Sequence, residues 1–195
     1  ERSEIVATTA GDVQGCVTGG IRIFRGIPYG APTGGAHRFR PPQPVEPWTG
    51  VRPARLFGET APQARTWLAA GGFEGNRPEI GEDCLVLNVH TPGTDDARRP
   101  VLVWLHGGGF EAGTGSVMLY DGVNVCRRGD VVVVTLTHRL NAFGYLYLDR
   151  SLRRAELADS GNCGQLDLVL ALQWVRDNIA AFGGNPDCVM AFGQS

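Results

Sequence analysis

The chain has 195 residues, of which 43% are hydrophobic and 19% are charged, and its formal net charge is -2. This length suffices for one sizeable hydrophobic core, and the composition excludes a disordered protein. The near-neutral charge gives no reason to expect nucleic acid or an anionic membrane as a partner, and every apolar run is too short to span a membrane.

The first part of the chain consists of short alternating segments. Residues 4–30 are punctuated by glycine pairs, which predicts short strands in a small antiparallel meander. Residues 31–81 are rich in Pro, Gly and Arg and show no sustained period. We therefore expect an ordered loop that wraps a domain, with a short helix near Arg65–Ala70.

The second part of the chain predicts buried strands. Asp83–Thr91 and Val101–His106 are apolar segments of strand length. Asp130–Leu140 is rich in β-branched residues without polar alternation, as expected for a strand that is buried on both faces of a parallel sheet. The three segments predict a central, mostly parallel sheet.

A helix and a last strand complete the predicted elements. Residues 165–184 have helical length and end at two glycines, which are a stop signal. Apolar residues recur at helical spacing and should form its buried face: Leu166, Val169, Leu170 and Trp174. Cys188–Gly193 is a short apolar strand. Strand, helix and strand at these lengths predict a βαβ unit and an α/β fold.

Two glycine clusters follow predicted strands directly. In His106–Phe110, which reads HGGGF, three glycines let the backbone approach a ligand with its N–H groups turned inward. A plain tight turn would explain three glycines equally well, but their position at the end of a strand favours an oxyanion loop of the HGGG type. Gly193-Gln194-Ser195 supplies the first three residues of a G-x-S-x-G nucleophile elbow, in which the serine stands between a strand and a helix.

With these motifs, the chain resembles the type-B carboxylesterases, a family of the α/β-hydrolase fold that includes bacterial para-nitrobenzyl esterases and cholinesterases. The matching blocks, in order, are FRGIPYG, RFRPPQPVEPW, EDCLVLNVHTP, PVLVWLHGGGF, GSVMLYDG, VVVVTLTHRLNAFGYL, GNCGQLDLVLALQWVRDNIAAFGGNPD and FGQS. The resemblance covers nearly the whole chain. It implies that residues 1–195 are the N-terminal part of a single α/β-hydrolase domain, which residues outside this chain complete.

The resemblance also implies a serine carboxylesterase that works through an acyl-serine intermediate. Ser195 matches the nucleophile of the family, and Gly108 and Gly109 match its two oxyanion-hole glycines. The triad acid and histidine lie downstream in the family, so the remainder of the protein would supply them. The implied partner is a small ester substrate, with no metal, no cofactor, no nucleic acid and no membrane.

Two other functions stay open. Some members of this fold family are adhesion or scaffold proteins without a triad, although Ser195 and the intact HGGGF loop argue against that function here. A thioesterase or a lactonase would keep the serine and change the substrate. The sequence does not separate these enzymes from an esterase, because the family builds its acyl pocket largely from residues outside this chain.

The cysteines bear on the compartment of the protein. The family often has Cys-Pro-Gln where this chain reads Ala61-Pro62-Gln63, and that cysteine pairs with the one that corresponds to Cys84. With alanine at position 61, we expect none of the five cysteines to form a disulfide. This favours a cytoplasmic protein. Secretion after removal of a leader stays open.

Other side chains also carry expectations. Two histidines, His106 and His138, should be structural, whereas His37 and His90 should lie at the surface.

In the family, the positions of Arg38 and Glu82 form an ion pair. We expect this pair to be buried or half-buried here, so that its disruption costs about 3–5 kcal/mol.

Overall fold

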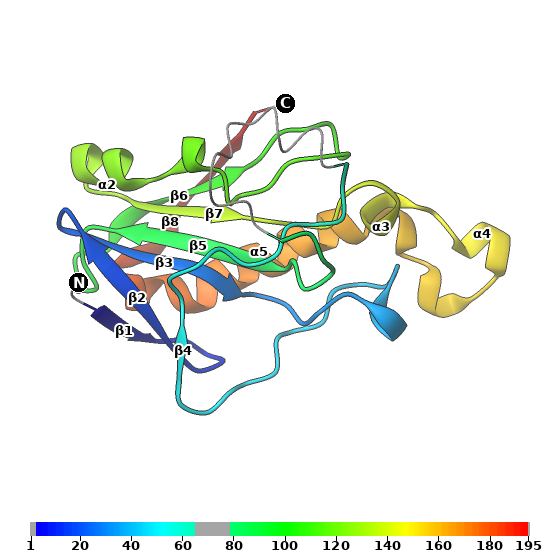
Figure 1. Cartoon of the computed structure of the whole chain (residues 1–195), viewed down its shortest axis with the longest axis horizontal. Helices are drawn as coiled ribbons and strands as arrows, with labels where there is room; N and C mark the ends of the chain where they lie inside the picture. Colours follow the sequence, from blue (N-terminus) through cyan, green and yellow to red (C-terminus); the bar gives the residue numbers. More distant parts are fainter. Residues whose placement is uncertain (1–2, 65–78, 195) are drawn as a thin grey trace.

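A mixed eight-stranded sheet forms the centre of the computed structural model, which describes residues 3–64 and 79–194 (Figure 1). In chain order the strands are β1 (Ser3–Ala7), β2 (Asp12–Thr18), β3 (Ile21–Pro28), β4 (Val51–Pro53), β5 (Val86–Thr91), β6 (Arg99–Leu105), β7 (Val132–Leu136) and β8 (Gly184–Gly193). Their order across the sheet is β1-β2-β3-β5-β7-β6-β8, and β4 pairs with β2.

The helices lie between or after the later strands. The α-helices are α2 (Val123–Gly129), α3 (Asn141–Tyr145), α4 (Asp149–Leu152) and α5 (Cys163–Asn178). Short 3-10 helices are η1 (Gly35–His37), η2 (Met118–Tyr120), η3 (Ala155–Leu157), η4 (Ser160–Asn162) and η5 (Ile179–Phe182). Gly183 follows η5 with a left-handed φ of 77°, so the predicted glycine stop of the long helix is confirmed.

The predicted N-terminal meander is confirmed, since β1, β2 and β3 pair antiparallel in sequence. The proline-rich segment that follows is mostly irregular, as expected, and it returns to the meander where β4 pairs parallel with β2. The helix that we predict near Arg65–Ala70 lies outside the described residues.

The parallel part of the sheet is smaller than predicted. Only β7, β6 and β8, together with the short β4, form parallel pairs, whereas β5 runs antiparallel to both β3 and β7. A parallel neighbour requires a crossover connection, which α2 provides between β6 and β7 and α5 provides between β7 and β8. The short turn between β5 and β6 leaves no room for such a helix.

Helices cover the two faces of this parallel part. Val101 and Val103 of β6 belong to the main hydrophobic core with Val175 of α5, which passes behind the sheet in Figure 1. Val133 of β7 packs instead with Cys126 of α2 in a second cluster on the other face. β7 is therefore buried along its whole length, as its β-branched sequence predicts.

The buried face of α5 differs from the prediction in part. Trp174 is buried and Leu170 packs against the core, but Val169 is 50% exposed. The buried positions of the helix are Cys163, Gly164, Asp167, Ala171, Trp174, Val175 and Asn178. Asp167 therefore lies on the buried face of α5, where the sequence pattern predicted apolar residues. Its carboxylate is buried there because it pairs with the buried guanidinium of Arg139.

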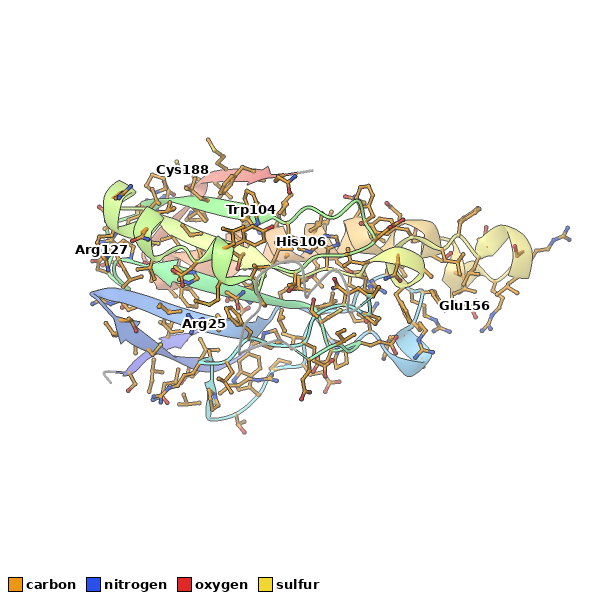
Figure 2. The ribbon with its side chains drawn as sticks, turned by 45° about the horizontal axis from the view of Figure 1, so that its top comes forward. Arg25, Trp104, His106, Arg127, Glu156 and Cys188 are labelled. Carbon is orange, nitrogen blue, oxygen red and sulfur yellow. The ribbon has the colours of Figure 1, made fainter. Side chains whose placement is uncertain are left out.

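The last strand, β8, has only one neighbour, β6, within the described sheet. Its residues Val189, Met190 and Phe192 are 38%, 60% and 39% exposed, and Cys188 lies at the rim of the molecule (Figure 2). The apolar sequence of β8 would suit a central strand. That residues outside this chain cover it stays a prediction.

All five cysteines are free; Cys188 is exposed and the other four are buried. The expectation that no disulfide forms is confirmed. Thiol titration of freshly prepared, denatured and unreduced protein should therefore find all five cysteines of this chain. Mass mapping of the alkylated peptides would attribute each thiol, and a missing pair would contradict the structure.

Among the described residues, no helix is long and apolar enough to cross a membrane.

Candidate functional site

The two glycine clusters leave the sheet at adjacent strand ends. β6 and β8 run parallel, and Leu105 pairs with Gly193 at their carboxyl ends. A Cβ on Gly193 would lie 2.5 Å from the carbonyl oxygen of Leu105, so the close approach of the two strands requires glycine there. In open α/β sheets, ligands bind outside the carboxyl ends of the strands. Gln194 is the last described residue, and Ser195 lies outside the described residues.

The glycine loop after β6 has an unusual backbone. Gly108, Gly109 and Phe110 all have positive φ angles, of 125°, 63° and 64°. The carbonyl oxygen of Gly108 accepts hydrogen bonds from the N–H groups of Glu111 (3.1 Å) and Ala112 (3.2 Å). A Cβ on Gly108 would lie 2.0 Å from the carbonyl oxygen of Ala112, whereas a Cβ on Gly109 would meet no atom of the described residues within 4 Å. Glycine is thus sterically required at 108 and conformationally favoured at 109.

Two amide groups of this loop have no acceptor among the described residues. Within residues 3–64 and 79–194, neither the Gly108 N–H nor the Gly109 N–H donates a hydrogen bond to the protein. Two neighbouring N–H groups without a protein acceptor, at the carboxyl edge of the sheet, have the chemistry of an anion-binding loop. The geometry supports the predicted oxyanion role of both glycines, which stays a prediction.

Two histidines, His106 at the start of this loop and His138 after β7, lie side by side. The rings of His106 and His138 stack with their centroids 4.7 Å apart, and both side chains are buried. Each Nδ1 contacts a carbonyl oxygen at 2.9 Å, that of Gly107 for His106 and that of Arg139 for His138. Burial lowers both pKa values, that of His106 to about 4, so both rings are neutral at neutral pH. These contacts agree with the structural role expected for both.

The other two histidines differ from each other. His37 is exposed, as predicted. His90 was predicted at the surface, and this is wrong, because it lies on β5 with 2% of its surface exposed. Its Nε2 is 3.8 Å from Oδ2 of Asp121, and burial lowers its pKa to about 4. A polar residue inside a strand that is buried on both faces gave no signal in the local sequence.

The predicted pair of Arg38 and Glu82 forms with two contacts, of which the one from Nε to Oε1 measures 2.7 Å. Its expected burial is borne out only for Glu82, since the Arg38 side chain is 42% exposed. The large cost that we predicted for breaking the pair therefore does not apply, because water screens an exposed pair. The loop around η1 extends away from the core, which explains the exposure (Figure 1).

The sequence did not predict a buried ion pair between Arg139 and Asp167. Arg139 and Asp167 have side chains that are 2% and 0% exposed, with Nη2 and Oδ1 2.6 Å apart. Asp167 also accepts a hydrogen bond from the backbone N–H of Arg139 at 2.9 Å. The pair ties the segment after β7, which carries His138, to helix α5. The sequence offered one signal for this pair, because Arg139 and Asp167 are charged residues inside two otherwise apolar runs.

Comparison with known proteins places this geometry in a family. The sequence model of the carboxylesterase family matches residues 2–195. The chain belongs to the carboxylesterase family. It is 45% identical over 192 residues to the para-nitrobenzyl esterase of Bacillus subtilis (strain 168) and 42% identical over 195 residues to the phenmedipham hydrolase of Pseudarthrobacter oxydans. The alignments cover 98% of this chain but 38% and 37% of these relatives, so the chain spans less than half of their length.

Solved structures of the family share the fold of this carboxylesterase chain. A para-nitrobenzyl (PNB) esterase superposes with a TM-score of 0.91 at 44% identity, covering 98% of this chain and 38% of the other. A carboxylesterase of Geobacillus stearothermophilus superposes with a TM-score of 0.87 at 43% identity, covering 97% and 37%. The predicted family and the predicted α/β-hydrolase fold are confirmed. Among the described residues, no group of three or more His, Cys, Asp or Glu side chains is arranged to hold a metal ion.

Proposed function

We propose that the protein containing this chain is a serine carboxylesterase, with Ser195 as its nucleophile and the N–H groups of Gly108 and Gly109 in its oxyanion hole. The observation that carries this proposal is the pairing of Leu105 with Gly193. Because of this pairing, the HGGGF loop and the Gly193-Gln194-Ser195 segment begin at neighbouring strand ends. The two N–H groups, which have no acceptor in the part of the chain that the structure describes, add to it, as does membership of the family.

The proposed reaction is acyl transfer in two steps. The Ser195 oxygen attacks the carbonyl carbon of a small carboxylic ester while a histidine takes the hydroxyl proton. The Gly108 and Gly109 amides stabilise the negative oxygen that develops, each donor contributing about 10²–10³ in rate. The C–O bond then breaks, the alcohol leaves with the proton from the histidine, and water hydrolyses the acyl-serine to release the acid. The scheme needs no metal and no cofactor.

We further propose that residues outside this chain supply the triad acid and the histidine and complete one α/β-hydrolase domain. His106 and His138 stack on each other, His90 is buried beside Asp121, and His37 is exposed, so the described contacts of the four histidines give no support for one of them as the catalytic base. The exposed apolar residues of β8 and the greater length of the relatives support the same proposal. Five free thiols support a reducing, cytoplasmic location.

Hydrolysis of a para-nitrophenyl ester by the intact protein tests the proposed function. Ser195→Ala should lower kcat by about 10⁶-fold, the order found when a serine hydrolase loses its nucleophile. Ser151→Ala is the matched control, because this exposed serine lies on α4 and should leave turnover unchanged. Turnover that survives in Ser195→Ala would move the nucleophile elsewhere, and an intact protein without esterase activity would favour a scaffold.

A further inference from the structure

The side-chain amide of Gln63 contacts the backbone of Gly113 at two points. Gln63 Nε2 donates to the carbonyl oxygen of Gly113 at 2.8 Å, and the Gly113 N–H donates to Gln63 Oε1, also at 2.8 Å. Gln63 belongs to the proline-rich segment, fifty residues before Gly113 in the sequence. A primary amide is suited to this contact, since it presents a donor and an acceptor side by side.

Gly113 in turn packs directly on the start of the glycine loop. A Cβ on Gly113 would lie 2.3 Å from Nδ1 of His106 and 2.4 Å from the carbonyl oxygen of Gly107. Its φ of 115° also favours glycine. The position of Gly113 therefore limits where His106 and Gly107 can lie, and these two residues lead directly into Gly108.

The same segment holds the other end of the loop through Asn141. The side-chain Nδ2 of Asn141 donates to the carbonyl oxygen of Pro62 at 2.5 Å. Its backbone N–H donates to the carbonyl oxygen of Phe110 at 2.6 Å. Pro62 and Gln63 are neighbours, so one short stretch of the proline-rich segment braces the glycine loop before and after Gly108 and Gly109.

We infer that Gln63 is a positioning residue of the oxyanion hole: its paired hydrogen bonds to Gly113 hold the Gly108 and Gly109 amides in place for the reaction. This inference rests on the proposed esterase function. Gln63 has no hydrogen bond to Gly108 or Gly109 themselves, so it would act on them through Gly113. Because small displacements of catalytic donors reduce rates strongly, losing the brace should affect the transition state more than substrate binding.

The test uses Gln63→Met in the intact protein, which keeps the length of the side chain and removes both hydrogen bonds to Gly113, together with the longer contacts of Gln63 Nε2 to Thr60 Oγ1 (3.2 Å) and to the carbonyl oxygen of Ala61 (3.1 Å). Gln43→Met is the matched control, since Gln43 is exposed in the same proline-rich segment and, among the described residues, its side chain bonds only Pro41, two residues away. Active sites are titrated with a fluorophosphonate, so that kcat refers to folded, reactive enzyme only. We expect kcat to fall about 10- to 100-fold in Gln63→Met with KM changed less than about threefold, and Gln43→Met to match the wild type.

A trifluoromethyl ketone inhibitor gives a second readout, because its hemiketal oxygen mimics the oxyanion of the reaction. Its affinity should weaken in parallel with kcat/KM in Gln63→Met. Gln63→Glu is the substitute variant if Gln63→Met folds poorly. It replaces the donor to the Gly113 carbonyl by an acceptor, and we expect it to show the same changes in kcat, KM and inhibitor affinity.

Wild-type kcat and inhibitor affinity in a Gln63 variant, or a change confined to KM, would overturn the inference. A wild-type protein that neither hydrolyses esters nor reacts at Ser195 would instead overturn the proposed function.

Discussion

Gly108→Ala is expected to lower kcat for ester hydrolysis by about 10²–10³-fold, the loss typical of one disabled oxyanion donor. The new Cβ would lie 2.0 Å from the carbonyl oxygen of Ala112, so the backbone of the loop has to move. That movement displaces the Gly108 and Gly109 amides together. Steady-state kinetics on a para-nitrophenyl ester, with circular dichroism to verify the fold, measures the effect.

Two further alanine variants separate catalysis from backbone strain. Gly109 and Gly35 have φ angles of 63° and 60°, and in the part of the chain that the structure describes a Cβ on either would meet no atom within 4 Å. Both substitutions therefore introduce similar left-handed strain, on the order of 1–2 kcal/mol. Only Gly109→Ala should lose most of its activity, because its Cβ would stand beside the proposed oxyanion. If Gly109→Ala and Gly35→Ala retain equal, near-normal turnover, the HGGGF loop is only a turn.

Asp167→Asn is expected to lower the free energy of unfolding by about 3–5 kcal/mol, because it leaves the guanidinium of Arg139 buried without its counter-charge. Both side chains are almost fully buried, and the carboxylate bonds the guanidinium and the backbone of Arg139. Urea unfolding of the intact protein, followed by tryptophan fluorescence and circular dichroism, measures the change.

Asp177→Asn is the matched control on the same helix. Asp177 pairs with Arg176, but the two side chains are 44% and 67% exposed, so water screens their attraction. Its unfolding midpoint should stay close to that of the wild type. Equal shifts in the two variants would show that burial of the Arg139 pair contributes nothing special.

Sequence patterns predicted the elements whose structure follows from their own local sequence. The run of valines in β7 indicated a strand buried on both faces, and the glycines after β6 indicated a backbone without side-chain obstruction. A family resemblance added the assignment of Ser195, which the local G-Q-S triplet alone does not support.

What escaped prediction depends on contacts between distant segments. The burial of Asp167 on α5 requires Arg139, which is 28 residues away in the sequence. The paired hydrogen bonds to the backbone of Gly113 require Gln63, which is fifty residues away. His90 lies in a strand whose two faces are covered by elements that its own sequence does not reveal. Hydrophobic periodicity carries no information on such pairings, so the buried polar positions were the ones misassigned or missed.

The proposed nucleophile can be tested most directly by labelling the intact protein with a fluorophosphonate probe and mapping the adduct by mass spectrometry. The account predicts one adduct, on Ser195, whose formation parallels the loss of ester hydrolysis and is absent from Ser195→Ala. An adduct on another serine, or complete inactivation while Ser195 remains unmodified, would contradict it.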